Sequence, residues 1–391
     1  MTTIEGFVEK GFEPVFSAFK SNFDNNDEIG AAVSIFIESK CVVDLWGGIA
    51  DTRSNKPWTK DSLQLVFSST KGATSILANI LIQEKILEID KPVCYYWPEF
   101  GENGKDEITV EELLTHKAGL PYIEESFELD DVVAWHPITQ ALARQNPIWK
   151  PGTEHGYHAI TFGWLVGELI RRALNEVSFR SCFEKLVSKP LGIDFYIGLP
   201  EELSDRVTHL KTIGRPEDEE MAKIYDAFVG PDTLTGKALM SPSPALKDME
   251  IWNNQTIYKA EIPSANGITD ARSLAKMYAS CVSTVEGQRL LSDEQLKLAT
   301  QVRTSGADKV LYFETKFGLG FMLPSLNSLY AGENAFGHDG AGGSHGWADS
   351  KHKVGFGYVM NKMIASLNGD PRSHALTNAL YRSIGEKEPF S

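Results

Sequence analysis

The chain reads Val66-Phe67-Ser68-Ser69-Thr70-Lys71-Gly72 at the point where a helix over residues 68–87 is predicted to begin. Ser68 or Ser69 fits the N-cap position of that helix, and its apolar stripe consists of Ile76, Leu77, Ile80 and Leu81. Residues three apart share one face of a helix, so Lys71 can reach the Ser68 hydroxyl. A serine hydroxyl becomes a good nucleophile only when a base takes its proton. The N-terminus of a helix stabilises an oxyanion and, together with burial, lowers the pKa of a lysine.

Strand patterns lie on both sides of this helix, near the two ends of the chain. Before it, residues 30–37 and 41–45 are rich in Val and Ile, and they predict a hairpin whose second strand ends at Trp46-Gly47-Gly48. After it, strands are predicted over residues 317–322, 345–349 and 354–360, with a hairpin link at 350–353. A helix is predicted at each end of the chain. The first carries Phe12, Val15, Phe16, Phe19 and Phe23, and the last begins at Asp370-Pro371.

The segment between the two groups of strands is predicted to be helical. A capping box begins at Thr109, and residues 158–174 have one apolar face. Prolines interrupt residues 196–265, which predicts loops with short helices, and Thr269 is expected to cap the next helix. The expected fold is α/β (α+β type), with a mixed, mostly antiparallel sheet flanked by helices and an inserted all-helical lobe. Residues 1–88 and 280–391 would form a discontinuous sheet domain, and residues 89–279 the mainly helical lobe.

Composition excludes several classes of protein. The chain has 391 residues, and with 42% of them hydrophobic it is too apolar to be disordered. A formal charge of −15 argues against nucleic acid and against an anionic membrane surface as partners. The N-terminus lacks a secretory signal pattern and no apolar run approaches the roughly 18 residues of a membrane span, so a soluble, cytoplasmic protein is expected. The cysteines are far apart and are expected to be reduced; they are Cys41, Cys94, Cys182 and Cys281.

The sequence predicts neither a cofactor nor a metal ion. It contains no phosphate loop and no dinucleotide fingerprint. His155 and His158 are three residues apart, but no third residue accompanies them at metal-ligand spacing.

Two further segments could contribute to a site with Ser68 and Lys71. Tyr157 lies in the glycine-containing turn 151–159 just before a helix, where a phenol near a lysine can relay a proton. The second segment is Gly337-His338-Asp339-Gly340-Ala341-Gly342-Gly343, in which so many glycines indicate a backbone that approaches a ligand closely. A backbone N–H here could complete an oxyanion hole, and His338 could face the site.

Ser344 offers a competing nucleophile, because residues 342–346 satisfy the pattern G-x-S-x-G. In α/β-hydrolases that pattern needs a strand before the serine and a helix after it, followed by an acid and then a histidine. The sequence after Ser344 is strand-like, and the upstream chain lacks the alternation of strands and helices. The pattern is therefore expected to be accidental.

The order of the three motifs resembles the serine β-lactamase and penicillin-binding-protein superfamily. The closest likeness is to family VIII carboxylesterases, which look like class C β-lactamases. Ser-x-x-Lys follows two strands, Tyr157 opens the second half of the helical region, and the glycine-rich motif lies near the C-terminus. Two other stretches match these esterases: Val43-Asp44-Leu45-Trp46-Gly47-Gly48 and Leu113-Leu114-Thr115-His116-Lys117-Ala118-Gly119-Leu120-Pro121.

The resemblance implies a role for each motif residue. Ser68 would be the acylated nucleophile, Lys71 its base, and Tyr157 would relay protons to the leaving group and from the deacylating water. The backbone N–H groups of Ser68 and Ala341 would form the oxyanion hole. Whether Lys71 or Tyr157 is the general base stays open at this point, because a coupled pair titrates as a unit.

Two departures from the family pattern bear on the substrate. Ala159 stands where class C β-lactamases carry the Asn of Tyr-x-Asn, and His338-Asp339-Gly340 replaces Lys-Thr-Gly. The site thereby lacks an amide and a cation that would hold a β-lactam, and a histidine is mostly neutral at pH 7. The expected function is a serine carboxylesterase acting on short-chain acyl esters. A β-lactamase, a D-amino-acid peptidase or an acyltransferase with the same residues, and a non-enzymatic scaffold, are the alternatives; the oligomeric state is open.

Overall fold

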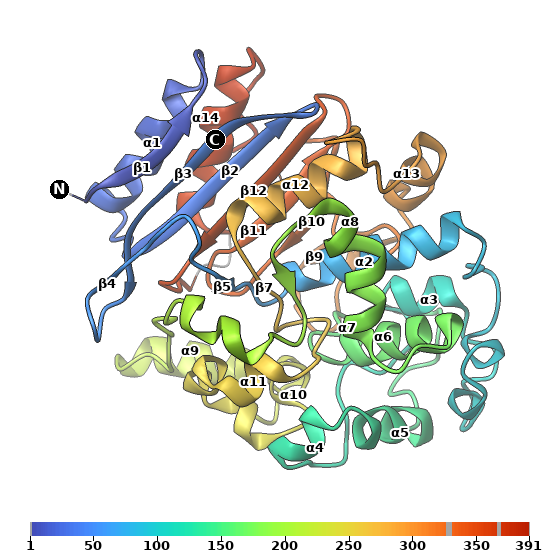
Figure 1. The fold of residues 1–391 in the computed structure, drawn as a ribbon. Coiled ribbons are helices and arrows are strands. Elements are labelled where there is room, and N and C mark those ends of the chain that lie inside the picture. The colour runs from blue at the N-terminus through green and yellow to red at the C-terminus, as the bar shows by residue number, and fades with distance from the viewer. Residues whose placement is uncertain (1, 326–330, 366–368, 391) are drawn as a thin grey trace.

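The computed structural model describes residues 2–325, 331–365 and 369–390. Its main sheet joins strands from both ends of the chain, in the order β1-β3-β2-β12-β11-β10, with β4 paired to β3 (Figure 1). The strands are β1 (Ile4–Val8), β2 (Gly30–Ile37), β3 (Lys40–Asp51), β4 (Lys56–Pro57), β10 (Ala335–Asp339), β11 (His345–Asp349) and β12 (Val354–Met360). Every neighbouring pair of these strands is antiparallel. The predicted mostly antiparallel sheet built from both termini is confirmed.

Helices cover both faces of this sheet. On one face, α1 (Glu13–Asn25) and α14 (Pro371–Ser383) pack against each other and close a core that contains Val15, Phe19 and Leu380. On the other face, α12 (Ala271–Val282) contacts β12, β2 and β11. The apolar spacing predicted for the first helix matches the buried face of α1 at Val15 and Phe19, whereas Phe16 is exposed.

The helix α2 (Ser69–Gln83) contacts the sheet strand β10 and the helix α6 of the inserted part, and Figure 1 shows it between the two. The other helices are α3 (Val110–Leu114), α4 (Leu129–Val133), α5 (His136–Arg144), α6 (Thr161–Leu174), α7 (Phe179–Phe183), α8 (Lys189–Leu191), α9 (Glu219–Val229), α10 (Leu234–Met240), α11 (Gln255–Lys259) and α13 (Asp293–Thr300). Fourteen of the residues of α2 are buried, so this helix is a central element of the core.

Short strands join the helical part, which is therefore mainly rather than wholly helical. A three-stranded sheet contains β5 (Gln64–Leu65), β7 (Ile268–Thr269) and β6 (Phe195–Tyr196), and β8 (Thr304–Ala307) pairs with β9 (Glu314–Phe317). The division into residues 1–88 with 280–391 and residues 89–279 stays a prediction. Its boundary at residue 280 falls inside α12, which packs on the sheet.

Three local predictions were wrong. The strand β3 continues past Gly48 to Asp51, because Ile49 and Asp51 pair with the short strand β4. The strand predicted over 317–322 ends at Phe317, where the chain turns through Gly320 with a positive φ. The helix α12 is capped by Asp270, which accepts a hydrogen bond from the Ser273 backbone N–H at 2.8 Å.

Two absences hold for the part of the chain that the structure describes. No helix there is long and apolar enough to cross a membrane. No group of three or more His, Cys, Asp or Glu side chains in the same residues could hold a metal ion.

Candidate active site

Ser68 occupies the N-cap position of α2, but its side chain makes no capping hydrogen bond there. The hydroxyl instead lies 3.1 Å from Nζ of Lys71, one helical turn along the chain. Phe67, just before Ser68, has a φ of 43°, a left-handed conformation that is strained for a residue with a large side chain. The prediction that α2 starts at Ser68 or Ser69 is confirmed, and the sharp turn at Phe67 leaves Ser68 partly exposed to solvent.

Lys71 is fully buried and has no carboxylate partner among the described residues. Its Nζ donates hydrogen bonds to the Ala159 carbonyl at 2.6 Å and to the Ser264 carbonyl at 3.0 Å. Burial lowers the pKa of Lys71 well below its usual value, because the charged form loses its hydration. A neutral amine has two N–H groups and one lone pair. The two carbonyls use both N–H groups, and the lone pair is left for the Ser68 hydroxyl.

Tyr157 lies beside Lys71, whose Nζ is 4.7 Å from the centre of the phenol ring. The Tyr157 hydroxyl is 3.4 Å from Nε2 of His338. Burial raises the pKa of Tyr157, and its hydrogen bond with the Ser68 side chain acts in the opposite direction. Tyr157 is therefore a neutral phenol that contacts Ser68 on one side and His338 on the other.

The ring of His338 has a defined tautomer. Its Nδ1 lies 2.7 Å from the Asp339 carbonyl oxygen, so this nitrogen carries the proton and Nε2 accepts from Tyr157. Burial lowers the pKa of His338 to about 3, because the charged form loses its hydration. The residue that replaces the family lysine is thus an uncharged acceptor.

The glycine-rich segment begins in β10 and turns at residues 340–343, next to the nucleophile segment. A Cβ on Gly340 would lie 2.2 Å from the Val66 carbonyl oxygen, so only glycine permits this approach. Ala341 follows on this turn and is exposed. Asp339 is opposite His345 in the β10–β11 pairing. Burial raises the pKa of the Asp339 carboxyl.

Asp308 is a buried residue of this region that the sequence analysis missed. Its Oδ1 accepts the backbone N–H of Tyr157 at 3.0 Å, and also those of Val310 and Leu311. Its Oδ2 accepts from the Thr315 hydroxyl at 3.2 Å. Asp308 lies about 150 residues from Tyr157 in the sequence, so no local pattern signals the contact.

Ser344 does not stand at a nucleophile elbow. It is fully buried and directly precedes the strand β11, whereas the elbow requires a helix after the serine. Its hydroxyl donates to the Val66 carbonyl at 2.7 Å and lies 3.3 Å from the Ser69 hydroxyl. The competing interpretation is therefore excluded, and Ser344 connects the glycine turn to the start of α2.

The contacts of Ser344 lead to a testable prediction. Ser344→Ala removes a hydrogen bond that tethers Val66, so we expect kcat to fall by about tenfold or less. A fluorophosphonate probe should still label Ser68 in this variant. Complete loss of labelling, measured by mass spectrometry of the intact protein, would contradict the assignment of Ser344 as a tether.

This fold and this arrangement of residues place the chain in a known class of proteins. Residues 17–379 match the β-lactamase family, and the chain belongs to that family. The resemblance to family VIII carboxylesterases within the serine β-lactamase superfamily is confirmed by the similarities that follow.

Three relatives show how far the similarity extends. The chain is 32% identical over 380 residues to the esterase/β-lactamase LipL of Mycobacterium tuberculosis. The aligned region covers 93% of this chain and 84% of LipL. A solved structure of a family VIII carboxylesterase superimposes with a TM-score of 0.85 at 35% identity, covering 97% of this chain and all of that one. EstA from Arthrobacter nitroguajacolicus Rue61a superimposes with a TM-score of 0.86 at 31% identity, covering 97% and 98%.

Proposed function

We propose that the protein hydrolyses neutral, short-chain acyl esters through a covalent acyl-enzyme on Ser68. The observation that carries this proposal is the buried Lys71 amine, 3.1 Å from the Ser68 hydroxyl and without an acidic partner among the described residues. The esterase relatives, LipL and the family VIII carboxylesterase, support it.

The proposed acylation step begins with proton transfer from Ser68 Oγ to the Lys71 amine. The oxygen attacks the ester carbonyl carbon, and the resulting oxyanion is held by the backbone N–H groups of Ser68 and Ala341. As the carbon–oxygen bond of the ester breaks, the proton passes through the Tyr157 hydroxyl to the leaving alcohol. In deacylation a water oxygen attacks the acyl carbon while the water gives a proton to the Lys71 amine through the Tyr157 hydroxyl. The bond between the acyl carbon and Ser68 Oγ then breaks, the proton returns to Oγ, and the carboxylic acid and free Ser68 are released.

The two pKa shifts assign the base within this proposal. Burial favours the neutral form of Lys71 and the protonated form of Tyr157, so Lys71 is the better proton acceptor of the two. Tyr157 can instead pass a proton, because it contacts Ser68 and its hydroxyl has His338 Nε2 as an alternative acceptor. We therefore propose Lys71 as the general base and Tyr157 as the relay.

The neutral His338 supports a preference for uncharged substrates. A pKa of about 3 leaves this residue without charge above pH 5, so it cannot neutralise a substrate carboxylate. The Ala159 methyl also offers no hydrogen-bond donor, and its carbonyl is occupied by Lys71. β-Lactam hydrolysis remains the second candidate because LipL carries both names, esterase and β-lactamase.

A substrate panel tests this preference. We expect p-nitrophenyl butyrate to be turned over with a kcat/KM on the order of 10²-fold or more above that of nitrocefin, an anionic β-lactam, because an unmatched charge is costly in a buried site. The panel should include p-nitrophenyl esters of increasing acyl length at equal enzyme concentration. Nitrocefin turnover equal to that of the ester would favour a β-lactamase instead.

We further propose that the protein acts on a small-molecule ester in the cytoplasm. All four cysteines are free thiols, which suits a reducing compartment. The net charge of −15 disfavours polyanionic partners.

A further inference from the structure

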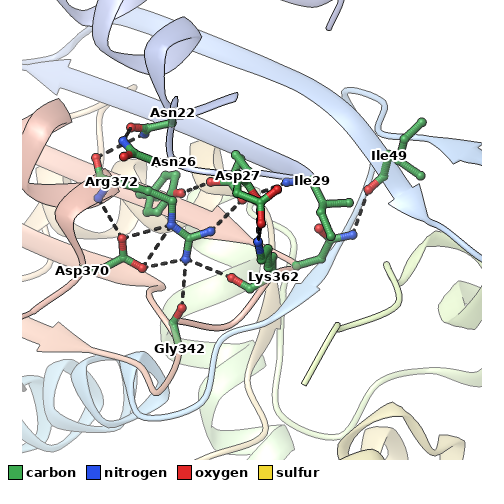
Figure 2. A network of polar contacts seen from close by, with 12 residues as sticks. Asn22, Asn26, Asp27, Ile29, Ile49, Gly342, Lys362, Asp370 and Arg372 are labelled. Carbon is green, nitrogen blue, oxygen red and sulfur yellow. Dashed lines mark hydrogen bonds and ion pairs between the residues drawn. The ribbon is translucent and has the colours of Figure 1, made fainter. Parts of the chain in front are cut away.

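Arg372, near the start of α14, is a completely buried arginine whose guanidinium is held on three sides. Its Nε and Nη2 bind the Asp370 carboxylate at 3.0 and 2.6 Å, and its Nη1 donates to Glu28 Oε1 at 2.8 Å. Figure 2 shows the guanidinium pointing from α14 toward the Gly342 and Lys362 carbonyls. A buried charge needs paired groups of this kind, and two carboxylates supply them here.

The guanidinium contacts the glycine turn directly. Nη2 donates to the Gly342 carbonyl at 3.1 Å and to the Lys362 carbonyl, at the end of β12, at 2.9 Å. A Cβ on Gly343 would lie 2.1 Å from Asp370 Oδ2 and 2.8 Å from Arg372 Nη2. The turn is therefore packed against the Arg372–Asp370 pair on one side and against Val66 on the other.

We propose that Arg372 is a positioning residue for the backbone N–H of Ala341, because it anchors the turn that carries this group. The proposal rests on the proposed function, in which this N–H stabilises the oxyanion. It adds a residue that lies outside the three motifs and about 30 positions from the turn in sequence.

The composition of the turn explains why such an anchor is needed. Glycines at 340, 342 and 343 allow many backbone conformations, so the turn has little stiffness of its own. An oxyanion donor acts only within about 2.7–3.1 Å of the charged oxygen. A displacement of about 1 Å can cost on the order of 10²-fold in rate. A guanidinium with several fixed donors holds a carbonyl more firmly than an ammonium does.

The anchor is itself tied to the sheet. Glu28 precedes β2 and is buried, and the Tyr358 hydroxyl of β12 donates to its Oε2. Burial raises the pKa of Glu28 to about 7, although Arg372 acts in the opposite direction. The chain of contacts from β12 through Glu28 and Arg372 to Gly342 fixes the turn relative to the strands beneath it.

The test compares Arg372→Lys with a matched variant, Arg272→Lys. Lysine keeps the positive charge at position 372 but lacks the planar set of N–H donors of the guanidinium. We therefore expect kcat for p-nitrophenyl butyrate to fall 10- to 100-fold while KM changes less than threefold. Affinity for an alkyl boronic acid, which forms a tetrahedral adduct with Ser68, should fall in parallel. Arg272 pairs with Asp44 at 2.8 Å between α12 and β3, so Arg272→Lys should change none of these quantities.

Circular dichroism checks that each variant is folded. If Arg372→Lys does not fold, the triple variant Glu28→Gln/Asp370→Asn/Arg372→Gln replaces it, because it leaves none of the three paired groups as an unpaired buried charge. The same loss of kcat and of boronate affinity is expected. A folded variant with kcat within threefold of the wild type, or with unchanged boronate affinity, overturns the proposal.

Failure of the proposed function would look different. Mass spectrometry of the wild type treated with a fluorophosphonate probe reports whether Ser68 is acylated. Absence of that adduct removes the proposed function, whereas an adduct at Ser68 together with undiminished kcat in the Arg372 variant removes only the role of Arg372.

Discussion

Ser68→Ala is expected to lower kcat by on the order of 10³-fold or more and to abolish fluorophosphonate labelling. The reason is that the reaction loses its proposed nucleophile, while the surrounding donors and the substrate site stay in place. The Ser68 side chain is partly exposed and makes no capping hydrogen bond, so the variant should keep its fold and its thermal midpoint. The measurement is the hydrolysis of p-nitrophenyl butyrate, with the probe adduct located by peptide mapping.

Ser344→Ala is the matched control for Ser68→Ala, because both serines lie at the same junction of α2 with the glycine turn. Comparing the two variants separates the loss of the proposed nucleophile, Ser68, from the loss of the Ser344 hydrogen bond to Val66. Ester hydrolysis retained in Ser68→Ala and lost in Ser344→Ala would reverse the two roles and refute the mechanism.

Lys71→Met should cause the second large loss, with kcat again lower by on the order of 10³-fold. Methionine is similar in length and apolar, but it cannot accept the Ser68 proton. In the wild type, kcat/KM should rise with pH as Lys71 loses its proton and then level off. Burial lowers the pKa of Lys71, so this rise should end well below pH 10.5, the ordinary pKa of a lysine. The pH profile of kcat/KM checks the direction of the Lys71 pKa shift.

Lys105→Met is the control for the Lys71 variant. Lys105 is also buried and donates to two backbone carbonyls, those of Glu102 at 2.8 Å and Gln145 at 2.6 Å. Burial lowers its pKa to about 8, yet none of its hydrogen bonds reaches the Ser68 site. We expect Lys105→Met to lower stability and to leave kcat within about threefold. An equal loss of kcat in both variants would show that burial of any lysine, and not its position, matters.

Local spacing made several features predictable. The helix α2 and the capping box at Thr109 depend on residues within four positions of one another, and the β2–β3 hairpin joins strands that are neighbours in sequence. Features that depend on distant partners were missed or misplaced. The strand β3 extends beyond Gly48 because β4 pairs with it there. The edge strand β1 has the sequence IEGFV, in which apolar and polar residues do not alternate regularly. Its strand conformation depends on pairing with β3, about 40 residues away in the sequence.

The same distinction applies to the site. The spacing of Ser68 and Lys71, and the order of the three motifs, pointed to the nucleophile and to the family. Asp308 and Arg372 were not found, because each acts on a segment that is remote in sequence. His338 was a candidate for facing the site, but its tautomer and its contact with Tyr157 required the fold.

The sequence by itself determined that a serine and a lysine share one face of a helix, since a spacing of three residues has the same consequence in any α-helix. Only the tertiary structure decided that the pKa of this lysine lies well below its usual value. That property comes from complete burial and from carbonyls at residues 159 and 264, which folding brings to its amine. The same holds for the glycine turn. Its glycines predict a flexible backbone, but the contact between Arg372 and the Gly342 carbonyl forms only when folding brings α14 to the turn.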